Sequence, residues 1–242
     1  MPRLATGETA ARAPEHPLLG MPRRDLLVTS VLAVATAVFF LVVANHASRA
    51  HIQNLDDAFL RRMGAIRSGT LTATARVFNF LGLVYVTLPV RLAIAGFLAF
   101  RRRWWHLLAF AGAIILAEIS IGTLKSLYDR TRPPGSLVHT SGGSFPSGHA
   151  VAASVTVVAA VIALFPEGPR RYAWGAAAVA FSLVMGLSRA YLAAHWLSDA
   201  VGGVLLGTTI ALATAIAVHT FRERRGRRGS AVAARSGSAV GL

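Results

Sequence analysis

The chain has 242 residues, of which 54% are hydrophobic and only 14% are charged, and its formal net charge is +15. Because soluble domains average about 25% charged residues, this composition predicts an integral membrane protein. The arginines are scattered between apolar runs and at both ends, with no basic aromatic face, so they argue for contact with anionic lipid and against nucleic-acid binding. The absence of cysteine excludes a disulfide framework.

Apolar runs dominate the chain from residue 26 to residue 220. The first of them, Leu26–Asn45, is long enough to span a membrane, since about 20 residues cross the hydrocarbon core. A secretory signal peptide is the alternative, but its apolar region is typically only about 7–15 residues long. Further spans are predicted at Val77–Phe100, Leu107–Tyr128, His149–Phe165, Tyr172–Tyr191 and Trp196–Thr220.

The expected fold class is therefore all-α, an integral membrane bundle of six transmembrane helices. Residues 1–25 are expected to form a cytoplasmic N-terminal tail, residues 26–220 the helical domain, and residues 221–242 a basic cytoplasmic C-terminal tail. Arginines gather in both terminal segments and in the connections on the same side, so the positive-inside rule places both termini in the cytoplasm. The five arginines between residues 49 and 76 run against this bias.

The first outer loop is predicted to contain a short helix lying on the membrane surface. Asn54 stands before Asp56 and Asp57, as at a helix start, and arginines follow towards residue 67. Leu55, Phe59, Met63 and Ile66 would share one face of this helix. A plain amphipathic connector and a substrate lid both fit this pattern.

Two charged residues lie inside predicted spans. Arg91 and Glu118 fall at similar depths in neighbouring spans when each residue advances about 1.5 Å along a helix. A lone charge within a membrane is costly, so we expect an ion pair between the two helices.

Lys125 is the only lysine of the chain, and it stands seven residues before Arg132. If one helix carried both, they would lie on nearly one face, and Pro133-Pro134 would end that helix. A compact ammonium beside a guanidinium suits a phosphate-binding site. Snorkelling of both side chains at a helix end is an equally good interpretation of this pair taken alone.

Ser147-Gly148-His149 opens a long apolar run. Serine is a favoured N-cap residue, and glycine lets a ligand approach the backbone closely. The free amides of a helix start bind anions readily. An ordinary capped helix is the alternative interpretation of the tetrapeptide Pro146-Ser147-Gly148-His149.

His195 and Asp199 are four residues apart at the start of the last predicted span. On a helix they share a face, so Asp199 is expected to accept the Nδ1–H of His195 and leave Nε2 free as a nucleophile. A metal ligand is the natural alternative for this histidine. The chain has only ten acidic residues, and cations such as Arg189 would repel a divalent ion, so we predict an anionic ligand and no metal.

In order, these segments read K-x6-R-P, P-S-G-H and S-R-x5-H-x3-D, from Lys125 to Asp199. This set resembles the three motifs of the type 2 phosphatidic acid phosphatase superfamily, on its membrane-bound lipid phosphatase branch. The resemblance extends over the six-span pattern, and the motif positions show no departure from it.

The resemblance implies cofactor-free and metal-free phosphoryl transfer through a phosphohistidine. His195 would attack phosphorus, Asp199 would orient His195, and His149 would protonate the leaving oxygen and then activate water. His149 would then have to start as imidazolium while His195 starts neutral. The phosphoryl oxygens would be held by Lys125, Arg132, Ser147, Gly148 and Arg189.

The function expected from these observations is hydrolysis of a lipid phosphate or diphosphate at the outer face of a bacterial cytoplasmic membrane. Phosphatidic acid, phosphatidylglycerol phosphate and undecaprenyl diphosphate are the substrate candidates. The alternatives are a phosphotransferase with an acceptor other than water and a non-catalytic lipid-binding or transport homologue. Residues 135–144 are interpreted as a flexible loop, with a role in substrate choice as the alternative.

Overall fold

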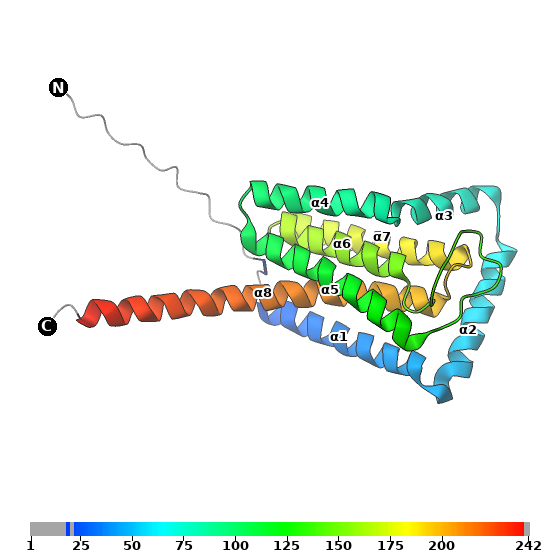
Figure 1. Cartoon of the computed structure of the whole chain (residues 1–242), viewed down its shortest axis with the longest axis horizontal. Coiled ribbons are helices and arrows are strands. Elements are labelled where there is room, and N and C mark those ends of the chain that lie inside the picture. The colour runs from blue at the N-terminus through cyan, green and yellow to red at the C-terminus, as the bar shows by residue number, and fades with distance from the viewer. Residues whose placement is uncertain (1–17, 20–21, 240–242) are drawn as a thin grey trace, which may run out of the picture.

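The computed structural model describes residues 18–19 and 22–239, with side chains for 18–19 and 23–227. The described part of the chain is all-helical, as predicted, and contains eight α-helices (Figure 1). These are α1 (Pro22–Ala44), α2 (His46–Ala65), α3 (Gly69–Leu81), α4 (Val84–Phe100), α5 (Trp104–Tyr128), α6 (Gly148–Leu164), α7 (Pro169–Tyr191) and α8 (Leu197–Ala239).

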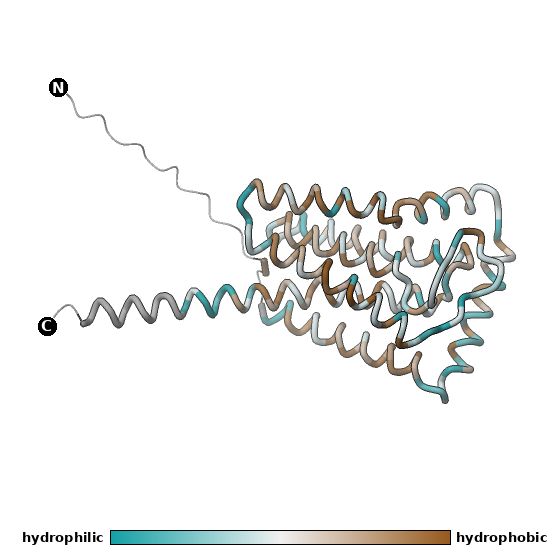
Figure 2. Tube along the Cα trace, in the orientation of Figure 1, coloured by the Kyte–Doolittle hydropathy of each residue, from teal (hydrophilic) through white to brown (hydrophobic). Residues whose placement is uncertain are grey.

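Four of the helices are long and apolar enough to cross a membrane, namely α1, α5, α7 and α8. The pair α3 and α4, bent by 50° at a short break, would add a fifth span. α6 is apolar but has only 17 residues, fewer than the about 20 that a span needs. Apolar residues cover the bundle, whereas polar residues gather on α2 and on the part of α8 beyond the bundle (Figure 2).

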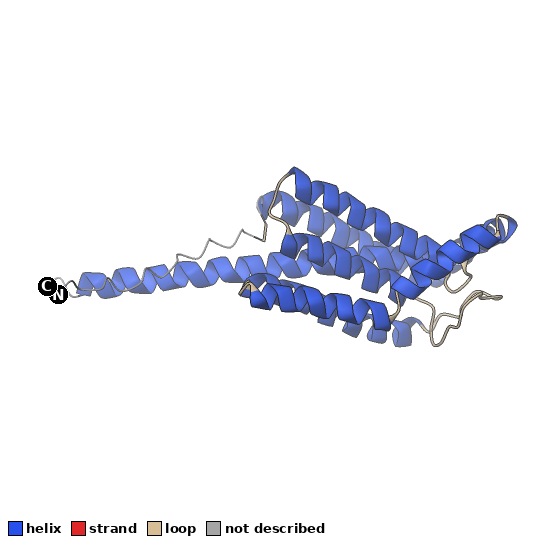
Figure 3. Cartoon of the chain, turned by 90° about the horizontal axis from the view of Figure 1, so that it is seen from above, coloured by secondary structure: helices blue, strands red, loops and turns tan. Residues whose placement is uncertain are grey.

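The long helices run alongside one another, and α2 crosses one end of the bundle (Figure 1). The connection between α5 and α6 lies at this same end, whereas α1 begins at the opposite end and α8 runs out beyond it (Figures 1 and 3). All the sequence motifs therefore gather at the end that α2 covers.

α2 is longer than the expected surface helix and starts earlier. Asn45 is its N-cap, with its side chain accepting a hydrogen bond from the Ala47 amide at 2.9 Å, so the prediction of a start near Asn54 was wrong. Leu55 and Ile66, expected on one apolar face, are exposed, and Asp56 is instead the buried residue of this helix.

α6 is the central helix and packs closely on α8 through glycines. A Cβ atom at Gly203 would lie 2.8 Å from the Ser147 carbonyl oxygen, and one at Gly207 would lie 2.6 Å from the Val151 carbonyl oxygen. Only hydrogen at these positions permits such an approach, which is the usual role of small residues between membrane helices. This contact sets the start of α8 beside the start of α6.

Both terminal segments differ from the expected tails. α8 continues as one helix through residues 221–239, where a tail was expected. At the other end most of residues 1–25 lies outside the described part of the chain, but Leu18 and Leu19 are buried in the main apolar core and α1 begins at Pro22.

Candidate active site

Three separate segments converge at the end of the bundle that α2 covers. They are the end of α5 with the loop that follows it, the start of α6, and the turn from α7 into α8. His149 lies within electrostatic range of Arg189, His195 and Lys125, and Lys125 lies within range of Asp199. The charged residues predicted for the site therefore lie near one another at this end of the bundle.

Lys125 and Arg132 do not share a helix, because the predicted span that carries Lys125 ends at Tyr128, as expected. α5 ends at Tyr128 because Asp129 adopts a left-handed conformation with φ of 36°, before Pro133 is reached. The two cations meet nevertheless at one carbonyl oxygen: Gly143 accepts from Lys125 Nζ at 2.6 Å and from Arg132 Nη2 at 3.2 Å.

The loop that was interpreted as flexible holds these cations in place. Arg132 Nη2 also donates to the Ser141 carbonyl at 2.7 Å, and Arg132 Nε donates to the Gly142 carbonyl at 2.9 Å. Ser144 is fully buried and is bound to the backbone of residues 130 and 131 through its amide and hydroxyl. A row of backbone carbonyls in residues 141–143 thus surrounds the positive charges, and these contacts, with those of Ser144, tie this part of the loop to the site.

Ser147 occupies the N-cap position of α6, as predicted, but its side chain does not cap the helix. The hydroxyl is buried without a hydrogen-bond partner among the described residues, and the Ser147 amide donates to the Asp199 carbonyl at 3.0 Å. Gly148 follows at the first helical position, where helix amides lack partners within the helix. A buried, unpartnered hydroxyl beside a helix start provides donors for an anion.

His195 lies in the tight turn between α7 and α8. The amides of Ala194 and His195 both donate to the Arg189 carbonyl, which folds the turn back over the end of α7. His195 Nδ1 lies 2.8 Å from the Ser144 carbonyl oxygen, so this nitrogen carries the proton and donates it. His195 Nε2 is then an acceptor, and Arg132 Nη1 lies 3.2 Å from it.

The environment of His195 keeps its imidazole neutral. Burial is the main cause that lowers the pKa of His195 to about 4, and the nearby Arg189 and Arg132 lower it further while Asp199 opposes them. A neutral imidazole with a free electron pair on Nε2 is the form that a nucleophile requires.

Asp199 does not make the hydrogen bond expected for it. Its Oδ2 lies 3.6 Å from His195 Nδ1, farther than the Ser144 carbonyl, and it accepts from the Trp196 amide at 2.8 Å. Its Oδ1 accepts from Arg130 Nη1, also at 2.8 Å. Asp199 is fully buried, so it acts on His195 as a fixed negative charge at close range.

Arg130 and Asp56 form an ion-pair network behind Asp199 that sequence analysis missed. Arg130 Nη2 donates to Asp56 Oδ2 at 2.7 Å, so this guanidinium bridges two buried carboxylates. Asp56 also accepts from the Ser198 amide and hydroxyl, at 2.8 and 2.6 Å. The side chain of Trp196, the residue before α8, has no oxygen that could accept from the first amides of this helix. Asp56 of α2 supplies a carboxylate that accepts from the Ser198 amide in the first turn of α8.

The break between α3 and α4 contributes two further residues that were missed. The side chain of Asn79 accepts a hydrogen bond from Arg189 Nη1, and Arg189 is 2% exposed. Gly82 lies against His149, because a Cβ atom there would be 2.3 Å from the imidazole Cδ2. His149 Nε2 is buried and has no hydrogen-bond partner among the described residues.

Comparison with known proteins identifies the family of this chain. The family model of the PAP2 superfamily matches residues 106–223. Phosphatidylglycerophosphatase B of Bacillus subtilis (strain 168) is 31% identical over 184 residues, which are 72% of this chain and 88% of that protein. The chain belongs to the PAP2 superfamily. It is a multi-pass membrane enzyme of the lipid phosphatase kind, a phosphomonoesterase.

Two solved structures share this fold. The crystal structure of the transmembrane PAP2 type phosphatidylglycerolphosphate phosphatase from Bacillus subtilis matches with a TM-score of 0.64 and 26% identity, over 84% of this chain and 96% of that chain. Aquifex aeolicus LpxE matches in fold alone, with a TM-score of 0.55 and 22% identity, over 66% of this chain and 94% of that chain.

The residues that sequence analysis missed in this PAP2 site had weak signals. Asp56 had the clearest signal, because it is a carboxylate in a predicted helix with several apolar residues. The sequence analysis interpreted it as part of a helix start. Arg130 stands two residues before Arg132 and was not singled out. Asn79 and the carbonyls of residues 141–144 are recognisable only once distant segments are brought together.

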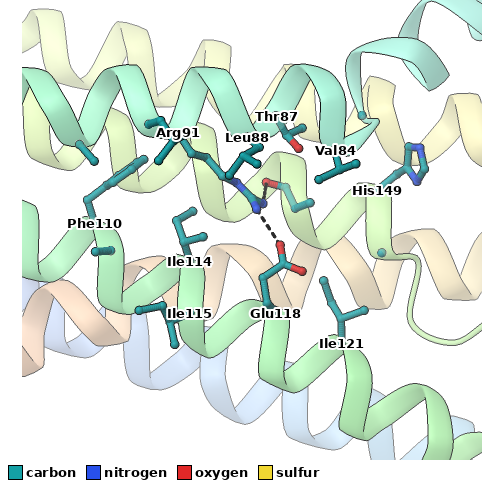
Figure 4. Close-up of a pocket in the computed structure, with 16 residues that line it drawn as sticks. Val84, Thr87, Leu88, Arg91, Phe110, Ile114, Ile115, Glu118, Ile121 and His149 are labelled. Atoms are coloured by element: carbon teal, nitrogen blue, oxygen red, sulfur yellow. Dashed lines mark hydrogen bonds and ion pairs between the residues drawn. The ribbon is translucent and has the colours of Figure 1, made fainter.

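A cavity of about 520 Å³ opens beside the PAP2 motifs, between α4, α5 and α6 (Figure 4). Gly148 and His149 line one end of it, and Phe110 lies at the other end. Its other lining residues are mostly apolar, so a lipid chain can occupy it while a phosphate lies beside His149.

Proposed function

We propose that this PAP2 enzyme hydrolyses a lipid phosphate through a phosphohistidine on His195, with phosphatidylglycerol phosphate as the first substrate candidate. The observation that carries the proposal is the neutral His195, whose Nε2 lies 3.2 Å from Arg132 Nη1, in electrostatic range of Arg189 and of His149, the histidine that lines the apolar cavity. Similarity to a protein named phosphatidylglycerophosphatase B supports the choice of lipid. Phosphatidic acid and undecaprenyl diphosphate are the other candidates.

In the first step His195 Nε2 attacks phosphorus, and the bond from phosphorus to the lipid oxygen breaks. His149 gives a proton to that oxygen, so the lipid leaves as an alcohol. In the second step His149 takes a proton from water, the resulting oxygen attacks phosphorus, and the phosphorus–nitrogen bond breaks to release phosphate and His195. His149 needs its proton in the first step, and a bound phosphate anion beside the buried imidazole favours the protonated form.

The phosphoryl oxygens are held by Lys125, Arg132, Ser147, the Gly148 amide and Arg189. Lys125 lies within electrostatic range of Arg132 and Arg189, and both arginines lie within range of His195, so positive charge would be available where negative charge develops during transfer. Phosphoryl transfer depends more on such positioning and charge stabilisation than on covalent assistance. Asp199 stabilises the imidazolium form of His195 that arises in the first step.

The membrane arrangement proposed for this site has six spans with both termini in the cytoplasm. α6 would be the short sixth span, enclosed by its neighbours, with α3 and α4 together forming another. The site would then lie at the outer face, at the depth of the lipid headgroups. The distribution of arginine supports this orientation.

Phosphate release from a panel of lipid phosphates and diphosphates tests the proposal. With the full chain purified in detergent, His195→Ala should lower kcat by about a thousandfold or more. His139→Ala is the matched control, since His139 is an exposed histidine of the neighbouring loop, and it should keep wild-type activity. Activity that survives His195→Ala would contradict the nucleophile assignment.

The same assay tests the absence of a metal from the mechanism. The resemblance implies a reaction without a metal, so activity should persist in excess chelator. Transfer of phosphate to an added alcohol with little release to water would instead support the phosphotransferase alternative.

A further inference from the structure

The cavity beside His149 contains one charged pair in otherwise apolar surroundings. Arg91 Nη1 lies 2.7 Å from Glu118 Oε1, which confirms the ion pair expected between these residues. Both residues line the cavity, and Figure 4 shows the pair between His149 and Phe110. A lipid that occupies the cavity must pass this pair.

Arg91 is fixed to the helix that carries His149. Its Nε donates to Thr156 Oγ1 at 2.9 Å, and its Nη2 lies 3.4 Å from the Ala152 carbonyl oxygen. Ala152 and Thr156 follow His149 by three and seven residues, or roughly 4.5 and 10.5 Å along α6. The guanidinium thus lies one to two helical turns beyond the catalytic imidazole.

Arg91 retains hydrogen-bonding capacity in this position. A guanidinium has five N–H groups, and the contacts above engage three of them within the described part of the chain. The Glu118 side chain is 52% exposed and the Arg91 side chain 11% exposed, and both residues line the cavity.

The depth of Arg91 matches oxygen atoms of glycerophospholipids. The ester carbonyl oxygens of phosphatidic acid and the phosphodiester of phosphatidylglycerol phosphate both lie about six bonds from the reacting phosphorus, or roughly 5–8 Å. A polyprenyl phosphate or diphosphate has only hydrocarbon at that distance. Placing hydrocarbon against a charged pair gains no hydrogen bond and displaces its water.

We propose that Arg91 is a specificity residue that binds an oxygen acceptor in the leaving group and so favours glycerophospholipid phosphates over polyprenyl phosphates. This proposal rests on the proposed lipid phosphatase function. Glu118 holds the guanidinium across the cavity and keeps the subsite close to neutral overall.

The test compares substrates that differ at this position: phosphatidylglycerol phosphate, a diacyl phosphatidic acid, its dialkyl ether analogue without carbonyls, and a polyprenyl monophosphate. We expect wild-type kcat/KM to be about tenfold higher for the diacyl lipid than for its ether analogue, equivalent to about 1.4 kcal/mol. In Arg91→Met, the ratio of either glycerophospholipid to the polyprenyl substrate should fall by about tenfold. If Arg91→Met loses only the preference for diacyl phosphatidic acid over its ether analogue, the ester carbonyl is the acceptor. If it loses only the preference for phosphatidylglycerol phosphate over the polyprenyl substrate, the phosphodiester is the acceptor.

One control variant separates recognition from folding. Arg101→Met makes the same substitution at an exposed position at the far end of α4, outside the proposed subsite, so the substrate ratios should stay at wild-type values. If Arg91→Met folds poorly, the double variant Arg91→Met/Glu118→Gln removes both charges together, which membrane-protein and soluble cores tolerate better than one unpaired charge.

Several outcomes would overturn the subsite. Wild-type ratios near one between both glycerophospholipids and the polyprenyl substrate would do so, as would an Arg91→Met variant that slows all substrates alike, or an Arg101→Met variant that loses the same preferences as Arg91→Met. Failure of the proposed function looks different: none of the four substrates would then release phosphate in a manner that depends on His195.

Discussion

The start of α8 depends on one carboxylate that comes from another helix. Asp56 is 2% exposed, and it binds Arg130 and the first turn of α8 through Ser198. Arg130 in turn holds Asp199, so α2 reaches the nucleophile through a chain of buried ionic contacts. This anchoring supports the interpretation of α2 as a fixed connector rather than a lid.

Asp56→Ala should destabilise the protein and misplace His195. Removal of one partner from a buried ion pair typically costs about 3–5 kcal/mol, because the remaining charge is left uncompensated. We expect a clear fall in Tm in detergent together with a loss of kcat. The matched control is Asp57→Ala, whose carboxylate only accepts from Gln53 on the same helix. Equal losses of Tm in the two variants would contradict the role given to Asp56.

Sequence analysis found the site residues whose spacing follows a helix or whose charge is costly in a membrane. Arg91 and Glu118 are charges inside predicted spans, and counting residues along the two spans places them at similar depth in the membrane. Sequence analysis failed where the hydrogen-bond partner is a backbone atom. His195 Nδ1–H donates to the Ser144 carbonyl oxygen instead of to Asp199. Every residue has a backbone carbonyl, so the residue type gives no sign of such a partner.

Among the helices, the contact between α6 and α8 controls the geometry of the site. α6 carries Ser147 and His149, and α8 carries Asp199 in its first turn. Glycines at 203 and 207 let the two backbones approach closely. The sequence predicted both helices, but not that these glycines face α6.

Gly207→Ala should push α8 away from α6. Its new Cβ would lie 2.6 Å from a backbone oxygen that cannot rotate away, and overpacking of this kind costs about 1–3 kcal/mol. Both Tm and kcat should fall. Gly175→Ala, in α7 with no atom within 4 Å of the new Cβ, should keep activity and gain slightly in helix stability. If Gly207→Ala behaves like Gly175→Ala, the close contact does not set the site.

Helix ends were predicted less well than helix centres. α5 ends at Tyr128, where the predicted span also ends, but α2 begins at His46 rather than near Asn54. The start of α2 depends on a single cap, the side chain of Asn45. Apolar periodicity says little about such a cap.

At the scale of the whole molecule, the site and the free end of α8 lie at opposite ends of the bundle (Figure 1). A bundle of this length crosses the membrane with the site on one side only. The orientation therefore decides which leaflet supplies the substrate.

The chain offers a direct test of orientation because it contains no cysteine. His139→Cys places a thiol in the loop beside the site, and Arg101→Cys places one in the turn between α4 and α5. In intact cells a membrane-impermeant maleimide should label the first variant and should label the second only after permeabilisation. The reverse pattern would put the site in the cytoplasm.

The carbonyl row of residues 141–143 has a consequence for turnover. Lys125 and Arg132 already hold oxygen ligands before any phosphate arrives. On the proposed function, substrate entry would exchange oxygen ligands, with phosphoryl oxygens replacing peptide carbonyls around these two cations. The carbonyls would then compete with the released phosphate, and we expect this competition to weaken inhibition by that anion.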